Sequence, residues 1–392
     1  MSFKGPLGRV ISTRHLHPRD LDWHVLVIAL VLLLTGVTFV HGLSSAAAGE
    51  LGGDVSYAAH RQKVLLSAPA LLLGLLLRRD WLRRHAIWLY AGSILLLVAV
   101  YVIGEERNNA QRWIQLPRFD LQPSELAKVA TIVALARVLV SNRMESASRW
   151  IVPLVVAGLP LLLVAGQPDL GTAMTLVPVT VGMFYMAGAR GPILASLCLL
   201  GLAGGLVARE ADLVRDYQLE RVETWLETYS PDELIASRDG AAFHLYHARL
   251  VAGNGGWMGR GLGRGVASET GLLPERDSDS IFMVVAEEGG FVSAAGIVLL
   301  YVLMSVLLIS SAAGLRDRFA RLVVGGVGIY FAAHLIINVS VNIGLLPMTG
   351  LTLPLFSTGG SSLLATFLAL GLAVGMAAHK DSSLDQDAFR SF

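Results

Sequence analysis

Cysteine is nearly absent from this sequence, and charged residues are scarce. The 392 residues include one cysteine, Cys198, which excludes a disulfide within the chain and a metal site built from cysteines. Only 16% of the residues are charged, 54% are hydrophobic, and the net charge is +1. A soluble domain needs more charge on its surface, and a chain this close to neutral has no overall field to attract nucleic acid. The composition predicts a membrane protein that does not bind nucleic acid.

Long apolar runs recur along the chain at the length that crosses a bilayer. A helix needs about 20 mainly apolar residues to span a hydrocarbon core of about 30 Å, because each residue adds about 1.5 Å. Ten candidate spans follow from this criterion: residues 22–43, 62–77, 86–104, 123–141, 150–166, 169–187, 191–208, 280–311, 322–343 and 361–378. The sequence therefore predicts an all-α, polytopic integral membrane protein with a single membrane domain, residues 22–378.

The basic residues of the short connections predict the orientation. Arginines cluster in every second connection, at positions 78, 79, 83, 84, 143, 149, 190, 316, 318 and 321. Connections rich in Lys and Arg stay in the cytoplasm. The segments 1–21 and 379–392 are therefore expected to be cytoplasmic, and the alternate loops to face the outside.

One predicted outer loop, residues 209–279, is far longer than the others. Loops of this length usually carry function or secondary structure of their own. Within it, Leu219, Val222, Leu226 and Tyr229 recur every three or four residues. This spacing predicts an amphipathic helix over 217–229, either at the membrane interface or on a solvated surface.

Two short polar stretches lie at the predicted outer ends of helices. The first contains Arg112 and runs into a predicted helix whose first turns hold Glu125 and Lys128. Glu125 suits a helix start, and a lysine three residues later is placed to pair with it, which would lower the cost of both charges at membrane depth. In the second stretch, Gln-Pro-Asp-Leu-Gly, Asp169 is either a helix cap or a site residue.

A third stretch combines seven glycines between Gly253 and Gly265 with arginines that include Arg260. Its backbone is able to approach a ligand, and guanidinium groups suit phosphate oxygens, although a flexible loop is the alternative interpretation. There is no Gly-Lys-Ser/Thr sequence, so ATP is not indicated.

Downstream, Glu275, Asp277 and Asp279 precede an apolar helix. A carboxylate partly withdrawn from water there is a candidate general base with a raised pKa.

The fourth stretch, residues 338–362, is rich in Gly, Pro, Ser and Thr between two apolar spans, and it contains Asn338 and Ser361. Irregular backbone lies at membrane depth only when protein or water covers it. This segment is predicted either to line a polar cavity or to form an exposed loop.

Together the four stretches resemble the SEDS family, whose members RodA and FtsW polymerise bacterial peptidoglycan. The matching segments include Gln-Pro-Ser-Glu-Leu-Ala-Lys, ending at Lys128, and Gly-Gly-Ser-Ser, ending at Ser362, and they occur in the family's order along the chain. Family motifs here differ at Asp277, Ser278, Ser280 and Thr358, and histidines at 244, 247 and 334 replace family glutamines. Lone histidines are usually structural hydrogen-bond donors.

The resemblance implies a glycosyltransferase that polymerises lipid II, with a class B penicillin-binding protein as partner. It places the essential aspartate at Asp279, and Asp277 beside it is a possible partner in titration. Candidate substrate-binding residues are Arg112, Glu125, Lys128, Asp169, Arg260, Glu275, Asn338 and Ser361. A divalent cation, Mg or Mn, is a candidate cofactor whose ligands the sequence does not identify. The motifs lean towards RodA and cell elongation.

Two other classes of function, and one alternative within the family, fit the same sequence features. A bundle with buried Lys and Glu would also suit a flippase that carries lipid II across the membrane, and an FtsW-like role in division is the alternative within the family. A non-catalytic scaffold for another synthase is the third possibility. Polymer made in detergent by the purified protein separates the enzyme from the other two.

Overall fold

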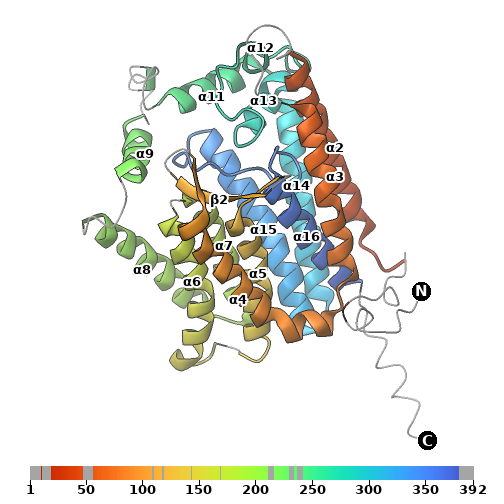
Figure 1. Ribbon diagram of the computed structural model, residues 1–392, viewed down its shortest axis with the longest axis vertical. Coiled ribbons are helices and arrows are strands. Elements are labelled where there is room, and N and C mark those ends of the chain that lie inside the picture. The colour runs from red at the N-terminus through yellow and green to blue at the C-terminus, as the bar shows by residue number, and fades with distance from the viewer. Residues whose placement is uncertain are drawn as a thin grey trace, which may run out of the picture.

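The computed structural model describes residues 10, 19–46, 56–107, 110–116, 119–142, 144–167, 169–210, 216–228, 234–235 and 242–378. The segments 1–21 and 379–392, predicted to be cytoplasmic, lie almost wholly outside the described residues. Long helices run in a bundle, and the shorter helices α9, α11, α12 and α13 gather at one end of it, at the top of Figure 1. We call this end the site end.

Nine of the ten predicted spans fall on one helix each, and the span 280–311 falls on two. The long helices are α2 (Trp23–Ala46), α3 (Tyr57–Leu76), α4 (Arg79–Ile103), α5 (Pro123–Leu139), α6 (Ile151–Gly166), α7 (Leu170–Ala187), α8 (Gly191–Glu210), α14 (Gly290–Gly314), α15 (Arg318–Asn342) and α16 (Gly360–Ala377). In the described part of the chain, 7 of the helical segments are long and apolar enough to cross a membrane. Helices α3, α5 and α8 are shorter in their apolar part or carry more charge. A multi-pass helical membrane protein is confirmed, and ten crossings stay a prediction.

The predicted span 280–311 is wrong at its start, because two helices occupy it. The short helix α13 (Ile281–Glu288) ends before α14 begins, and the chain turns at Gly289 and Gly290. Gly290 has a φ of 73°, and a side chain there would collide with the backbone of Gly259. Only glycine tolerates both conditions, so the helix breaks at this point.

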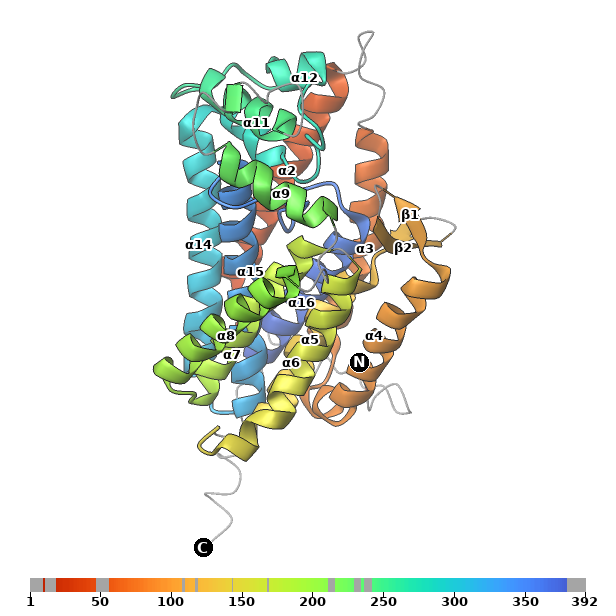
Figure 2. The same ribbon diagram turned by 90° about the vertical axis from the view of Figure 1, so that its left-hand side faces the viewer.

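The other short helices of the loop before α13 lie at or towards the site end (Figure 2). Helices α9 (Asp216–Glu227), α11 (Phe243–Asn254) and α12 (Val266–Thr270) occupy the loop that precedes α13, and the 3-10 helix η1 (Ala147–Trp150) precedes α6. The amphipathic helix predicted over 217–229 is α9. Trp225 and Arg221 of α9 donate hydrogen bonds to the carbonyls of Gly344 (3.0 Å) and Met348 (3.2 Å). Helix α9 therefore holds the chain that follows α15.

A small antiparallel sheet, which sequence patterns did not predict, leads into α5. Its strands are β1 (Glu105–Arg107), β2 (Ala110–Leu116) and β3 (Phe119–Leu121), in the order β1-β2-β3. Glu105 pairs with Trp113, and Gln115 pairs with Asp120. The strands are too short and too polar to show an alternating pattern, yet the sheet fixes the position of Arg112.

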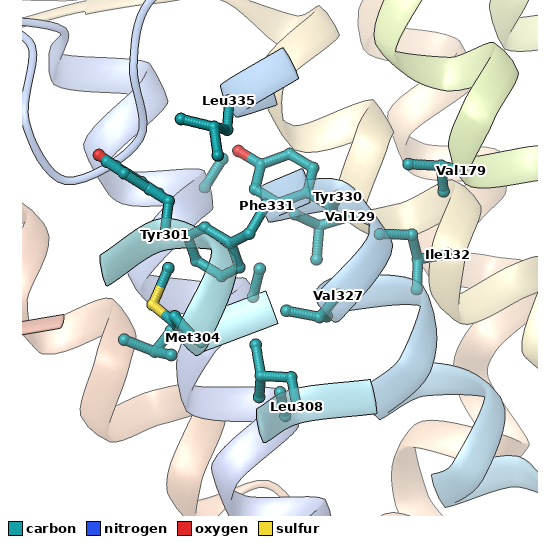
Figure 3. Close-up of a cluster of buried hydrophobic side chains, with 14 of the residues drawn as sticks. Val129, Ile132, Val179, Tyr301, Met304, Leu308, Val327, Tyr330, Phe331 and Leu335 are labelled. Carbon is teal, nitrogen blue, oxygen red and sulfur yellow. The ribbon is translucent and has the colours of Figure 1, made fainter. Parts of the chain in front are cut away.

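Helices α15 and α16 form the centre of the bundle. In their apolar windows 78% and 83% of the residues are buried, against 28% for α4. Helix α16 approaches α3 through Gly371 and Gly375, and a Cβ atom at Gly74 of α3 would come within 2.7 Å of the α16 backbone. Small residues four apart permit this close packing. Figure 3 shows the neighbouring aromatic and aliphatic core, in which Tyr301 of α14 and Tyr330 of α15 are buried.

Candidate active site

Asp279 lies in the turn before α13, and two asparagines of α15 hold its main chain. The side-chain amides of Asn338 and Asn342 donate to the carbonyl oxygen of Asp279 at 3.0 and 2.9 Å. Asn338 also donates to the carbonyl of Leu351 at 2.6 Å. The structure thus brings Asn338 to Asp279, where it positions the aspartate through its backbone. The Asp279 carboxylate takes no part in these hydrogen bonds.

The segment between α15 and α16 forms the wall opposite that turn. The hydroxyl of Ser357 donates to the carbonyl of Ser278 at 2.6 Å, and the hydroxyl of Thr358 donates to the Asp277 carboxylate at 2.5 Å. Gly350 has a φ of 67°, and a Cβ atom there would lie 3.2 Å from Oδ2 of Asp279. Segment 338–362 therefore packs against the turn that carries Asp279, and its lining of a polar cavity stays a prediction.

Asp169 caps a helix and also contacts Arg112. Its Oδ1 accepts the backbone N–H of Thr172 at 3.2 Å, which caps α7, and lies 3.7 Å from the guanidinium of Arg112. Its Oδ2 accepts from Gln122 at 2.9 Å and from Ser124 at 3.0 Å. These contacts join the sheet, α5 and α7, and they fix Arg112 beside a buried carboxylate.

Glu125 and Lys128 form the predicted pair inside the bundle. The ammonium of Lys128 donates to Oε1 of Glu125 at 2.9 Å and contacts Nε2 of His334 at 3.0 Å. His334 Nδ1 lies 3.3 Å from the carbonyl of Thr352, so Nδ1 carries the proton and Nε2 accepts from Lys128. Three N–H bonds belong to an ammonium, and these two contacts leave one available. The Lys128 ammonium also lies 5.5 Å from the centre of the Tyr330 ring.

The pKa of Asp279 is raised from 3.8 to about 7, first by burial and then by the nearby Glu275, Asp169 and Asp277 carboxylates, while Arg112 lowers it. Asp279 precedes the membrane-spanning α14. Low polarity and neighbouring negative charge both disfavour the ionised carboxylate. A carboxyl group with a pKa near neutrality is suited to accept and release protons during a reaction.

If Asp279 is the general base of the reaction, its carboxylate acts in the ionised form. We therefore expect the rate of that reaction to rise with pH up to about 7 and then level off. Arg112→Gln removes the charge that lowers the pKa of Asp279, so the midpoint should move to higher pH. Initial rates measured from pH 5 to pH 9 give both midpoints. Arg149→Gln, in an exposed ion pair with Glu145, is the control, and an equal midpoint in Arg112→Gln would contradict the assignment.

The other predicted residues have different places. Ser361 donates to the carbonyl of Asp120 at 2.6 Å and accepts the N–H of Gln122 at 2.8 Å, so it ties α16 to the chain entering α5. Glu275 is exposed and accepts from Ser278 at 2.7 Å. The structure does not bring Arg260 to this group. Its backbone N–H donates to the carbonyl of Glu287, at the other end of α13.

Several site residues escaped the sequence analysis or received only a structural role there. They are His244, whose Nε2 lies 2.9 Å from the Ser280 hydroxyl, together with Asn342, Thr358 and His334. Burial lowers the pKa of His244 to about 4. A polar residue on an otherwise apolar span, such as His334, was the available signal, but its partner was not visible in the sequence.

The residues present do not form a metal cage by themselves. In the part of the chain that the structure describes, no group of three or more His, Cys, Asp or Glu side chains is placed to hold an ion. Magnesium often needs only one or two protein carboxylates when a substrate supplies phosphate oxygens. Asp279 and its acidic neighbours fit that smaller requirement.

Comparison with known proteins gives one family. Residues 22–382 match the family FTSW_RODA_SPOVE, described as "Cell cycle protein". The chain is 32% identical over 379 residues to the probable peptidoglycan glycosyltransferase FtsW of Allochromatium vinosum, covering 94% of this chain and 92% of that one. It is 34% identical over 379 residues to the FtsW of Thiomicrospira cyclica that bears the same description, covering 93% of each.

Solved structures agree with these sequence matches. One is a chain of a peptidoglycan synthase complex, described as showing the structural coordination of polymerization and crosslinking. It has a TM-score of 0.74 and 27% identity, and the match covers 94% of this chain and 99% of that one. Another is the rod shape determining protein RodA of Thermus thermophilus, with a TM-score of 0.66, 27% identity and coverage of 91% and 96%. The similarity extends over nearly the whole of both chains.

Proposed function

Since the chain belongs to the FtsW, RodA and SpoVE family, we propose that it is a peptidoglycan glycosyltransferase that polymerises lipid II on the outer face of the bacterial cytoplasmic membrane. One observation carries the proposal beyond the family match. Asp279, with a pKa of about 7, lies among residues that include the cationic Arg112. This transfer requires a base that accepts the proton of the acceptor hydroxyl. It also requires a cation that stabilises the leaving diphosphate.

In the proposed step, Asp279 accepts the proton of the acceptor sugar's hydroxyl. The hydroxyl oxygen bonds to the anomeric carbon of the donor sugar, while the bond from that carbon to the diphosphate oxygen breaks. Arg112 and the remaining N–H of Lys128 stabilise the negative charge that develops on the diphosphate. The lipid-linked diphosphate is already activated, so the reaction needs no ATP on the outer face.

Polymerisation by the isolated protein tests this function. Purified protein in detergent is incubated with labelled lipid II, and the products are separated by length. Glycan strands longer than the disaccharide unit support a polymerase, because a flippase has no bilayer to act across and a scaffold makes no bond. Absence of polymer under conditions where a known synthase works would refute the proposal.

We propose that a divalent cation, Mg or Mn, enters with the substrate and is held by one of the acidic neighbours of Asp279. A cation so held would supply charge stabilisation for the diphosphate. We expect EDTA to lower the rate at least tenfold and added Mg²⁺ or Mn²⁺ to restore it. Binding of Mn²⁺, followed by electron paramagnetic resonance, should require the diphosphate lipid, and tight binding without lipid would contradict this arrangement.

The biological role and the partner belong to the same proposal. The motifs lean towards RodA and elongation, whereas the curated relatives compared above bear the name FtsW, which favours division. Depletion of this protein in cells distinguishes the two roles, since loss of a division enzyme gives filaments and loss of an elongation enzyme gives rounded cells.

One structural relative comes from a complex that joins polymerization to crosslinking, which supports a class B penicillin-binding protein as partner.

A further inference from the structure

One exposed side of α2 changes from apolar to polar along its length. Exposed positions on this side recur every three or four residues and include Trp23, Val27, Leu30, Leu34, Thr38, His41 and Ser45. Tryptophan is common at membrane interfaces, and at 1.5 Å per residue His41 lies about 27 Å beyond Trp23 along the helix. A hydrocarbon core is about 30 Å thick. The polar part of the stripe therefore reaches the headgroup layer at the site end.

A pocket of about 380 Å³ opens on this polar part, between α2 and the glycine-rich segment that follows α11. His41 and Ser45 line it from α2, and Leu262 and Arg264 line it from the glycine-rich segment. The His41 ring packs edge-on against Tyr57 of α3 at 4.8 Å. The pocket therefore combines an apolar side chain with a fixed imidazole and a guanidinium.

Arg264 carries the charge that this pocket offers to a ligand. Its side chain is exposed, and within the described residues no acidic or carbonyl partner occupies its guanidinium. A guanidinium binds phosphate oxygens through two parallel N–H bonds. His41 adds a ring nitrogen able to donate a hydrogen bond.

Among the residues that the structure describes, Glu287 and Glu288 are the acidic residues beside the glycine-rich segment, and both are engaged elsewhere. Both carboxylate oxygens of Glu287 accept backbone N–H groups, of Val266 at 2.9 Å and of Ala267 at 3.0 Å. Glu288 is 2% exposed, accepts a hydrogen bond from Ser268, and has its pKa raised by burial. The described lining residues therefore carry a positive charge from Arg264, which favours an anion as the ligand.

We propose that this pocket binds the phosphate of a lipid headgroup in the leaflet at the site end, with the lipid's chains along the apolar stripe of α2. The pocket lies at the level of the headgroup layer and opens on the exposed side of a membrane helix. Both features favour a lipid over a free anion as the ligand. The ligand's class is a phosphate-bearing lipid, whether a glycerophospholipid or a polyprenyl diphosphate. The site is separate from Asp279, which lies at the opposite end of α13.

Native mass spectrometry of the full-length protein in detergent tests the proposal. The protein is titrated with phosphatidylglycerol, with undecaprenyl diphosphate, with inorganic phosphate and with phosphate-free monoglucosyl diacylglycerol. We expect one tightly held phospholipid or diphosphate lipid, with the neutral glycolipid and inorganic phosphate held at least tenfold more weakly. Preference for either phosphate lipid identifies the source and supports the site, and equal binding of the neutral glycolipid would overturn it.

Two variants alter the pocket in independent ways. Arg264→Gln removes the charge, and Ser45→Trp fills the volume from an exposed position. Each should raise the lipid concentration at half occupancy at least tenfold. Arg260→Gln is the matched control on the same segment, since its side chain hydrogen bonds to Asn254 at 3.3 Å outside the pocket lining. Unchanged binding in both pocket variants, or an equal loss in the control, refutes the site.

A photoreactive amino acid at position 45 adds a second measurement, made in membranes. Crosslinking to lipid supports the proposal. Crosslinking to a protein in place of lipid shows a docking surface and overturns it.

Discussion

Asp279→Asn should lower the rate of lipid II polymerisation by about 100- to 10,000-fold while the protein folds normally. General-base catalysis typically contributes that factor, and asparagine is unable to accept the proton. The fold should survive because Asn338 and Asn342 bind the Asp279 backbone carbonyl, which asparagine retains. Polymer yield and the thermal unfolding midpoint are measured on the same preparation.

Glu145→Gln is the control for this substitution, since it removes an exposed carboxylate that pairs with the exposed Arg149. Asp277→Asn identifies which neighbouring carboxylate matters. The Asp277 carboxylate already accepts a hydrogen bond from Thr358, so we expect less than a tenfold loss from its replacement. A normal rate in Asp279→Asn, or a greater loss in Asp277→Asn, would remove Asp279 from the mechanism.

Lys128→Met should destabilise the protein and abolish its activity. The ammonium and the Glu125 carboxylate are 2% and 4% exposed, so removal of one charge leaves the other buried without compensation. Breaking such a pair costs about 3–5 kcal/mol. The unfolding midpoint in detergent should fall markedly, and the rate should fall with it because a cation for the diphosphate is lost.

A double variant separates the structural role of this pair from its catalytic role. Lys128→Met with Glu125→Gln removes both charges, and replacement of a buried ion pair by neutral groups is often close to neutral for stability. We expect the unfolding midpoint to recover and the polymerisation rate to stay low. Recovery of the rate along with the midpoint would show that Lys128 acts only in folding.

Local sequence patterns determined the helices and the contacts within them. The apolar runs fixed where the long helices lie, because lipid requires every backbone group to bond within its own helix. The Glu125 and Lys128 pair and the Asp169 cap follow from helical spacing alone, since their partners are three residues away. For the same reason, α9 could be predicted from its periodicity.

Tertiary structure decided which of these elements meet. The Asn338 and Asn342 contacts with Asp279 join residues 59 and 63 positions apart, and Lys128 meets His334 across 206 positions. The break at Gly290 and the distance of Arg260 from the site also depend on packing between segments, which periodicity does not record. A sequence pattern determines which residues share one face of a helix. Only the packing of the helices determines which buried polar groups of different helices meet.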